Sequence, residues 1–172
     1  MQRQTTEDRE CALERLMAEY GDQVMRTCLL YLQRRQPAED AAQETFIRAW
    51  RAIDRLQSKD TEKAWLMKIA VNVCKSALRS RSRRIPDAQV SEDEIPETGT
   101  TDQYPDRTVY DAVNSLPVKY RSPVILHYYQ GLPVSDIAGI LHIPGATVRT
   151  RLSRARALLR NELEGWYFDD EQ

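Results

Sequence analysis

The sequence predicts an all-α protein of two small helical domains joined by a flexible acidic linker. Strand-like alternation of apolar and polar residues is nearly absent, and the 172 residues include only six glycines. Apolar residues instead recur at spacings of three and four, the period of an amphipathic helix. The pattern stops over residues 85–106, which predicts domains at 8–84 and 107–164 on either side of a linker.

Three helices are expected in the first domain. The first spans residues 8–33, with Gly21 as a local break, and carries an apolar stripe at helical spacing: Leu13, Leu16, Met17, Tyr20, Val24 and Cys28. The second spans 37–56, with Pro37 at its first position, and we expect one buried side: Ala42, Phe46, Ala49, Trp50 and Ile53. The third follows a cap at Asp60 or Thr61 and runs to residue 83. Its expected buried stripe is Leu66, Ile69, Ala70, Val73 and Ala77.

Four helices are expected in the second domain, over residues 108–116, 119–130, 134–141 and 145–163. Pro117 ends the first of them, and Pro123 is tolerable only near the first turn of the second. The last two helices flank a short turn at 142–144, the arrangement of a helix-turn-helix. A small core should fix the angle between them: Ile137, Ala138, Leu141, Val148 and Leu152.

The charge of the chain is sorted along the sequence although the net charge is only −1. Residues 63–86 contain no acid and seven cations: Lys63, Lys68, Lys75, Arg79, Arg81, Arg83 and Arg84. Residues 137–161 contain no acid and five cations: Arg149, Arg151, Arg154, Arg156 and Arg160. Between them, residues 87–106 carry seven acids and no Lys or Arg. Two acid-free basic helices indicate two separate contacts with a polyanion.

Several function classes are excluded by what the sequence lacks. The sequence has no run of about 18 apolar residues, the length that a membrane-spanning helix needs. Residues 1–10 are polar and do not resemble a signal peptide, so we expect a cytoplasmic protein. Cys11, Cys28 and Cys74 are widely spaced and fit neither a disulfide framework nor a zinc pattern, so we expect them on helix faces. His127 and His142 are solitary. The sequence therefore predicts no metal, no cofactor and no enzymatic site.

The second helix of the helix-turn-helix is the expected reader of duplex DNA. Arg149, Thr150, Ser153 and Arg154 lie on one surface of its N-terminal half, where base edges come within reach of such a helix. Other arginines of this helix are better placed for phosphate contacts, which position the protein without specifying sequence: Arg151, Arg156 and Arg160. The alternative is an exposed basic helix without a ligand.

Four segments, in this order and spacing, carry a resemblance to a known family. They are residues 38–53 (AEDAAQETFIRAWRAI), 64–73 (AWLMKIAVNV), 116–121 (LPVKYR) and 144–156 (PGATVRTRLSRAR). Together they resemble the extracytoplasmic-function (ECF) group of bacterial sigma-70 factors over roughly residues 10–163. Many members of that group have Gly directly before Thr147, whereas here the order is Gly145 and then Ala146. A phosphate contact that needs close backbone approach at Thr147 would be altered by this departure.

The resemblance implies roles for residues of the first domain, called sigma-two in the family. The second helix would bind the clamp helices of the RNA polymerase beta-prime subunit through Asp40, Gln43 and Glu44; the alternative is a solvated helix face. A pocket for a flipped-out base would form at Ser58, Lys59, Asp60 and Thr61. Asn72 would read a base beside the melted junction, and Trp65 would support the pocket or pack in the core. The phosphate backbone of the minus-ten region would follow Lys68, Lys75 and Arg79.

The resemblance also implies the partners. The second domain, called sigma-four, would bind the minus-thirty-five element of promoter DNA and the beta-flap of core RNA polymerase, and an anti-sigma factor is an expected inhibitor. The linker would thread through the active-site cleft of the polymerase; a solubilising tether is the alternative. A stand-alone helix-turn-helix regulator is the rival function. The tail at 166–172 either packs back on its domain or serves a partner.

Overall fold

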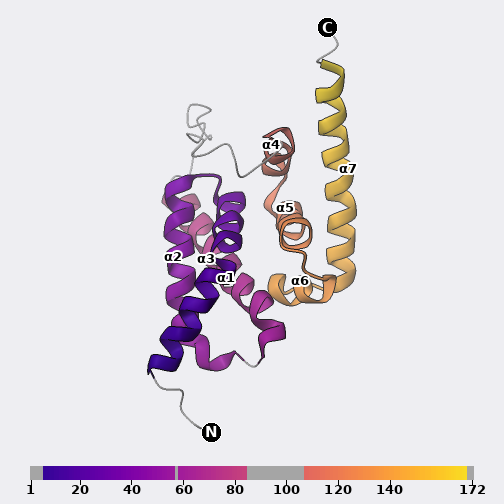
Figure 1. The fold of residues 1–172 in the computed structure, drawn as a ribbon. Helices are drawn as coiled ribbons and strands as arrows, with labels where there is room; N and C mark the ends of the chain where they lie inside the picture. The colour runs from indigo at the N-terminus through magenta and orange to yellow at the C-terminus, as the bar shows by residue number, and fades with distance from the viewer. Residues whose placement is uncertain (1–5, 57, 85–106, 170–172) are drawn as a thin grey trace. The chain divides into compact units, whose positions relative to one another are not determined.

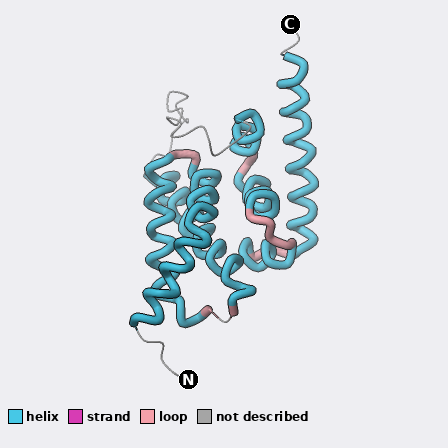
Figure 2. The backbone as a smooth tube through the Cα atoms, viewed as in Figure 1, coloured by secondary structure: helices cyan, strands magenta, loops and turns pink. Residues whose placement is uncertain are grey.

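The computed structural model describes residues 6–56, 58–84 and 107–169, and the linker predicted at 85–106 lies outside the described residues. The chain divides into two compact units, Met1–Ile95 and Pro96–Gln172, which are described separately. Every regular element among the described residues is helical, and short turns connect the helices (Figure 2). The prediction of an all-α protein is therefore confirmed.

Three helices form the first unit: α1 (Thr6–Leu32), α2 (Arg35–Ala52) and α3 (Glu62–Arg84). Each of the three packs against the other two (Figure 1). Two short 3-10 turns, η1 (Ile53–Arg55) and η2 (Lys59–Thr61), lead from α2 to α3. The core lies between the three helices and includes Leu16, Val24, Leu66 and Val71, which are all fully buried.

Two expectations about the first unit are wrong in detail. Helix α1 continues through Gly21 without a break, because packing of a long amphipathic helix outweighs the modest helix penalty of one glycine. Helix α2 begins at Arg35, so Pro37 is its third residue and not its first. Proline is tolerated there because the first four backbone N–H groups of a helix have no intrahelical acceptor. The first ladder bond of α2 runs from the Ala38 N–H to the Arg34 carbonyl, at 3.1 Å.

The buried side of α2 matches the predicted one only in part, since Ala49 and Ile53 are buried but Ala42, Phe46 and Trp50 are not. The residues it buries are small, namely Ala38, Ala41, Thr45 and Ala49. Small side chains let the backbones of packed helices approach closely, so this stripe, and not the larger neighbouring one, faces α1 and α3. Phe46 is only half-buried and Trp50 is exposed, which corrects the expectation that both belong to the core.

The cysteines lie on helices as expected, but their environments differ. Cys11 is exposed on α1, whereas Cys28 of α1 and Cys74 of α3 are buried. A hydrogen bond with Cys28, together with burial, raises the pKa of the Cys74 thiol well above its usual range. Both buried thiols therefore act as small packing residues of the α1–α3 interface.

Four helices form the second unit: α4 (Arg107–Ser115), α5 (Val118–Val124), α6 (Val134–Leu141) and α7 (Gly145–Asp169). Helix α6 has the predicted bounds, and α7 runs six residues beyond the predicted end at 163. A π-helical turn, η4 (Ile125–Tyr129), extends α5 toward α6. Helix α7 contacts α4, α5 and α6, so it forms the spine of this unit.

The expected helix over residues 119–130 is present from Val118 to Tyr129, but its last turn is π-helical and not α-helical. Helix α5 begins at Val118, which places Pro123 in its second turn and not near its start. Proline has no N–H to donate and its ring crowds the preceding turn. The chain then widens into η4, where the Gln130 N–H donates to the Ile125 carbonyl at 3.1 Å. Gly131 ends this segment with a φ of 66°, a left-handed conformation that glycine adopts without steric cost.

His142 ends helix α6 in a left-handed conformation, with a φ of 54°. Backbone N–H groups close the turn, and the Ile143 N–H reaches the Ala138 carbonyl at 3.1 Å. Because a residue with a Cβ is strained there, His142→Gly should raise the free energy of unfolding by roughly 0.5 kcal/mol. Urea unfolding followed by circular dichroism measures this change. His142→Ala is the control and should give no gain; a loss of stability in His142→Gly would contradict the prediction.

Candidate nucleic-acid interface

The helix-turn-helix of the second unit is held by an apolar core. Ile137, Val148 and Leu152 are buried, and Leu141 is 8% exposed. Ala138 is half-buried, so it lies at the edge of this core and not at its centre. The core fixes α7 against α6 and leaves the polar side of α7 in solvent, the arrangement that lets a second helix enter a major groove.

The exposed side of α7 carries most of the residues predicted to contact DNA. Five of them are exposed: Arg149, Thr150, Ser153, Arg154 and Arg156. Thr147 and Arg151 are half-buried at the border of this side. The Thr150 hydroxyl donates to the Ala146 carbonyl at 3.0 Å, which leaves its lone pairs as acceptors. Side chains predicted to meet base edges therefore share one continuous surface.

Two tyrosines touch this basic surface through contacts that were not predicted from the sequence. The Arg156 Nη1 donates to the Tyr128 hydroxyl at 3.1 Å. A hydrogen bond from Arg154 lowers the pKa of Tyr120, whose ring also lies 4.9 Å from the Lys119 ammonium. These partners are 28 and 34 residues apart in the chain, so no local spacing signals the pairs.

A second polar stripe follows one side of helix α3 in the first unit. Lys68, Asn72 and Arg79 are exposed, and Lys75 is half-buried beside them. Steps of three and four residues place all four on one side of the helix. Trp65 lies on the same side of the helix, one turn nearer its start. It is half-buried, so it is neither a core residue nor a fully exposed one.

The four residues before α3 form an exposed corner of the first unit. Ser58, Lys59, Asp60 and Thr61 are all exposed. The Thr61 hydroxyl donates to the Ser58 carbonyl at 3.0 Å, and the Thr61 N–H reaches the same carbonyl at 3.3 Å. These bonds hold the corner as a single tight turn next to the polar stripe of α3.

An ion pair anchors this corner to helix α1. The Glu62 carboxylate is nearly buried, with 4% of its side chain exposed, and it receives two bonds from the Arg15 guanidinium. One of them joins Arg15 Nη1 to Glu62 Oε2 at 2.9 Å, and the other joins Nη2 to Oε1. The hydrogen bond with Glu62 raises the pKa of Arg15. Two parallel bonds fix both distance and orientation, so this pair positions the start of α3.

Helix α2 presents a separate polar row of predicted partner-binding residues. Asp40 and Gln43 are exposed and Glu44 is half-buried. Asp40 accepts a bond of 3.1 Å from Gln36, and Glu44 accepts one of 2.6 Å from Arg48. Exposed pairs within one helix are weak, so a partner's cations can replace them at small cost.

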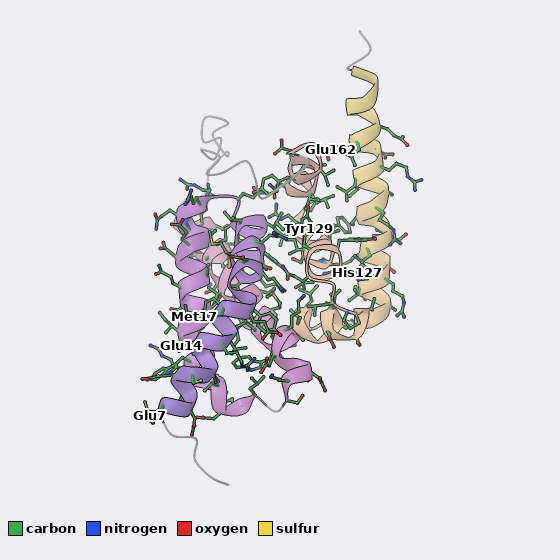
Figure 3. The ribbon with its side chains drawn as sticks, viewed as in Figure 1. Glu7, Glu14, Met17, His127, Tyr129 and Glu162 are labelled. Atoms are coloured by element: carbon green, nitrogen blue, oxygen red, sulfur yellow. The ribbon has the colours of Figure 1, made fainter. Side chains whose placement is uncertain are left out.

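Beside this row lies an apolar groove between α1 and α2, with a volume of about 550 Å³. Its lining residues are Leu13, Met17, Ala42, Gln43, Phe46, Ile47 and Trp50. Met17, labelled in Figure 3, is 48% exposed, and Ile47 is 45% exposed. Trp50 is held from the α1 side, because Arg9 Nη2 donates to the Trp50 carbonyl at 2.9 Å and the guanidinium lies 5.0 Å from the ring.

Within the described parts of the chain, no three His, Cys, Asp or Glu residues gather closely enough to hold a metal ion. No helix in those parts is long and apolar enough to cross a membrane.

Family comparisons match both units. Residues 16–84 match the family "Sigma-70 region 2", and residues 106–159 match the family "Sigma-70, region 4". The RNA polymerase sigma-H factor of Pseudomonas aeruginosa is 30% identical over 167 residues, which cover 89% of this chain and 86% of the relative. The ECF RNA polymerase sigma factor SigW of Bacillus subtilis is 32% identical over 158 residues, or 84% of each chain.

Solved structures agree in fold. The sigma factor RpoE of Bartonella quintana, in complex with the anti-sigma factor NepR, matches with a TM-score of 0.73 at 25% identity, over 88% of this chain and 96% of that one. CnrH, in complex with the cytosolic domain of CnrY, matches in fold with a TM-score of 0.66 at 21% identity, over 91% of this chain and 90% of that one.

These matches confirm the resemblance to the ECF group and favour it over a stand-alone helix-turn-helix regulator. Members of this family are non-enzymatic initiation factors that bind core RNA polymerase and promoter DNA. The chain belongs to the ECF group of the sigma-70 family, and it directs promoter-specific initiation of transcription.

Proposed function

We propose that the two units divide the work of promoter recognition between them. Residues 8–84 bind core RNA polymerase and act at the minus-ten element, and residues 107–164 bind the minus-thirty-five element. The observation that carries this division is that each unit has one helix with a basic, acid-free exposed side. These sides lie over residues 63–84 of α3 and 145–161 of α7. Two modest contacts on one chain reinforce each other through effective concentration.

Each basic helix has its own kind of contact. On α7, Arg149, Thr150, Ser153 and Arg154 read base edges, whereas Thr147, Arg151 and Arg156 hold phosphates. The corner at 58–61 receives a flipped-out base of the melted strand, with Trp65 as its neighbour, and Asn72 reads a base at the junction. Along α3, the phosphates follow Lys68, Lys75 and Arg79. All four corner residues are exposed, and the α3 residues share one side of the helix; both observations support these roles.

The polymerase contacts lie on other surfaces. Asp40, Gln43 and Glu44 bind the beta-prime clamp helices, where cations of the partner replace the weak pairs with Gln36 and Arg48. The second unit contacts the beta-flap, and residues 85–106 occupy the cleft of the polymerase between the two docking sites.

An anti-sigma factor is the proposed inhibitor of this chain. The sigma factor RpoE of Bartonella quintana was solved in complex with the anti-sigma factor NepR. We place the protein in the cytoplasm, where core polymerase and DNA are found.

Transcription from fragments of the host genome tests the proposal as a whole. Purified core polymerase is used with and without the protein, and start sites are mapped. New start sites that share two spaced upstream elements are expected only with the protein. No new start sites, together with no binding to core polymerase, would leave the stand-alone regulator as the better account.

Asn72→Ala is expected to lower open-complex formation about tenfold while binding to core polymerase stays unchanged. The amide both donates and accepts, and its loss removes a base contact worth on the order of 1–3 kcal/mol. Permanganate footprinting of the melted strand measures the open complex, and competition for core polymerase measures binding. Lys68→Ala, one turn earlier on the same side of α3, is the control and should weaken all promoters alike. Equal loss of melting and core binding in Asn72→Ala would refute the base-reading role.

A further inference from the structure

The hydrogen bond between Arg156 and Tyr128 joins the second helix of the helix-turn-helix to the segment that precedes the motif. Arg156 Nη1 lies 3.1 Å from the Tyr128 hydroxyl oxygen, across 28 residues of sequence. Tyr128 is 53% exposed, which is unusual for so large an aromatic side chain. Core packing therefore does not explain why a tyrosine occupies this position. The hydrogen bond from Arg156 indicates a polar role for its hydroxyl at the basic surface of α7.

A π-helical turn and a neighbouring histidine set the orientation of the Tyr128 ring. Tyr128 lies in the π-helical turn η4, and single π turns within helices are frequent at functional sites. Its neighbour His127, labelled in Figure 3, has Nδ1 at 3.1 Å from the Leu132 carbonyl. The two rings meet edge to face, with centroids 4.8 Å apart and planes at 78°. The histidine thus ties the tyrosine ring to the loop before α6.

The bond to Tyr128 leaves Arg156 able to hold a phosphate. A guanidinium has five N–H donors in a fixed fork, and the tyrosine hydroxyl takes one of them. Arg156 is exposed, and an exposed arginine loses much side-chain entropy when a ligand immobilises it. A hydroxyl that already orders the guanidinium in the free protein reduces that loss on binding.

We propose that Tyr128 is a positioning residue for the upstream promoter contact, because its hydroxyl holds the Arg156 guanidinium in place for a DNA phosphate. This inference rests on the proposed function, in which the exposed side of α7 binds the minus-thirty-five element. Tyr128 acts through Arg156 and does not itself touch the DNA.

A double-mutant cycle with intact holoenzyme tests the proposal. The variants are Tyr128→Phe, which removes only the hydroxyl, Arg156→Ala, and the two combined. Arg160→Ala, alone and with Tyr128→Phe, is the matched control, because Arg160 is an exposed arginine one turn further along α7. Apparent Kd values are measured on a promoter fragment found by start-site mapping, and on the same fragment with its upstream element scrambled.

Tyr128→Phe is expected to raise the Kd about two- to tenfold, the range for ordering one long side chain. The loss should disappear when Arg156 is already alanine and persist fully with Arg160→Ala. A general disturbance of the fold would instead act in every background, so this dependence isolates the role of Arg156. No loss, a gain in affinity, or an equal loss without Arg156 would each overturn the proposal.

The same measurements separate this inference from the proposed function. Arg149→Ala is measured on the same two fragments. If α7 does not bind the upstream element, Arg149→Ala and Arg156→Ala will leave the Kd unchanged on both fragments. If only the role of Tyr128 is wrong, those two variants will weaken binding to the intact element and Tyr128→Phe will not.

Discussion

Arg15→Ala is expected to lower the free energy of unfolding of the first unit by about 3 kcal/mol. The substitution leaves the Glu62 carboxylate nearly buried, with 4% of its side chain exposed, and without its bidentate partner. Removal of one member of a buried pair costs about 3–5 kcal/mol, and the 36% exposure of Arg15 places this pair at the lower end. The corner at 58–61 should loosen as well, since Glu62 is the first residue of α3.

Urea unfolding of the full chain, followed by circular dichroism, measures the loss. Arg15→Ala combined with Glu62→Gln should recover part of it, because the amide no longer buries a charge. Arg35→Ala is the matched control: its bond to Glu39, at 2.8 Å, is an exposed pair within one helix and should matter by less than about 0.5 kcal/mol. A loss below about 1 kcal/mol in Arg15→Ala would contradict the anchoring role.

Arg154→Ala should relax the preference of the holoenzyme at one base pair of the upstream element. An arginine that bonds a guanine edge contributes about 1–3 kcal/mol of discrimination, so roughly tenfold or more should be lost at that position. Arg154 is exposed on the same surface as Arg149. It also bonds Tyr120, a residue that lies outside the helix-turn-helix. Affinity for other upstream sequences should change much less.

Initiation from a library with a randomised upstream element measures this preference. Arg151→Ala is the control, because a phosphate contact should weaken all sequences about equally and reduce the salt dependence of binding by about one ion. If Arg154→Ala instead lowers every sequence by the same factor, Arg154 is a phosphate contact and not a base reader.

Local features of the sequence were sufficient to predict the helices and the helix-turn-helix. The bounds of α6 were predicted to the residue, because its apolar periodicity ends at Leu141 and a turn with Pro144 follows. The two acid-free stretches were visible for the same reason: charge and helical period are properties of neighbouring residues. The exposed sides of α3 and α7 then follow from the spacing alone.

Conformation at single positions was less predictable. No local sequence pattern predicted that His142 would adopt a left-handed conformation. None predicted that α5 would contain Pro123 and continue into a π turn. Each departs from intrinsic backbone preference, and each lies in or beside a helix that packs against α7.

Periodicity, charge and motif spacing were enough to predict the all-α class, the helix order, the helix-turn-helix and the family to which the chain belongs. Which of two adjacent stripes on α2 is buried depends on how the three helices pack, and that packing leaves Trp50 in an open groove. Helix packing also brought together Arg15 with Glu62, and Arg156 with Tyr128, across 47 and 28 residues. The physical reason is that periodicity reports the contacts of one helix, whereas side chains on different helices meet only after those helices pack.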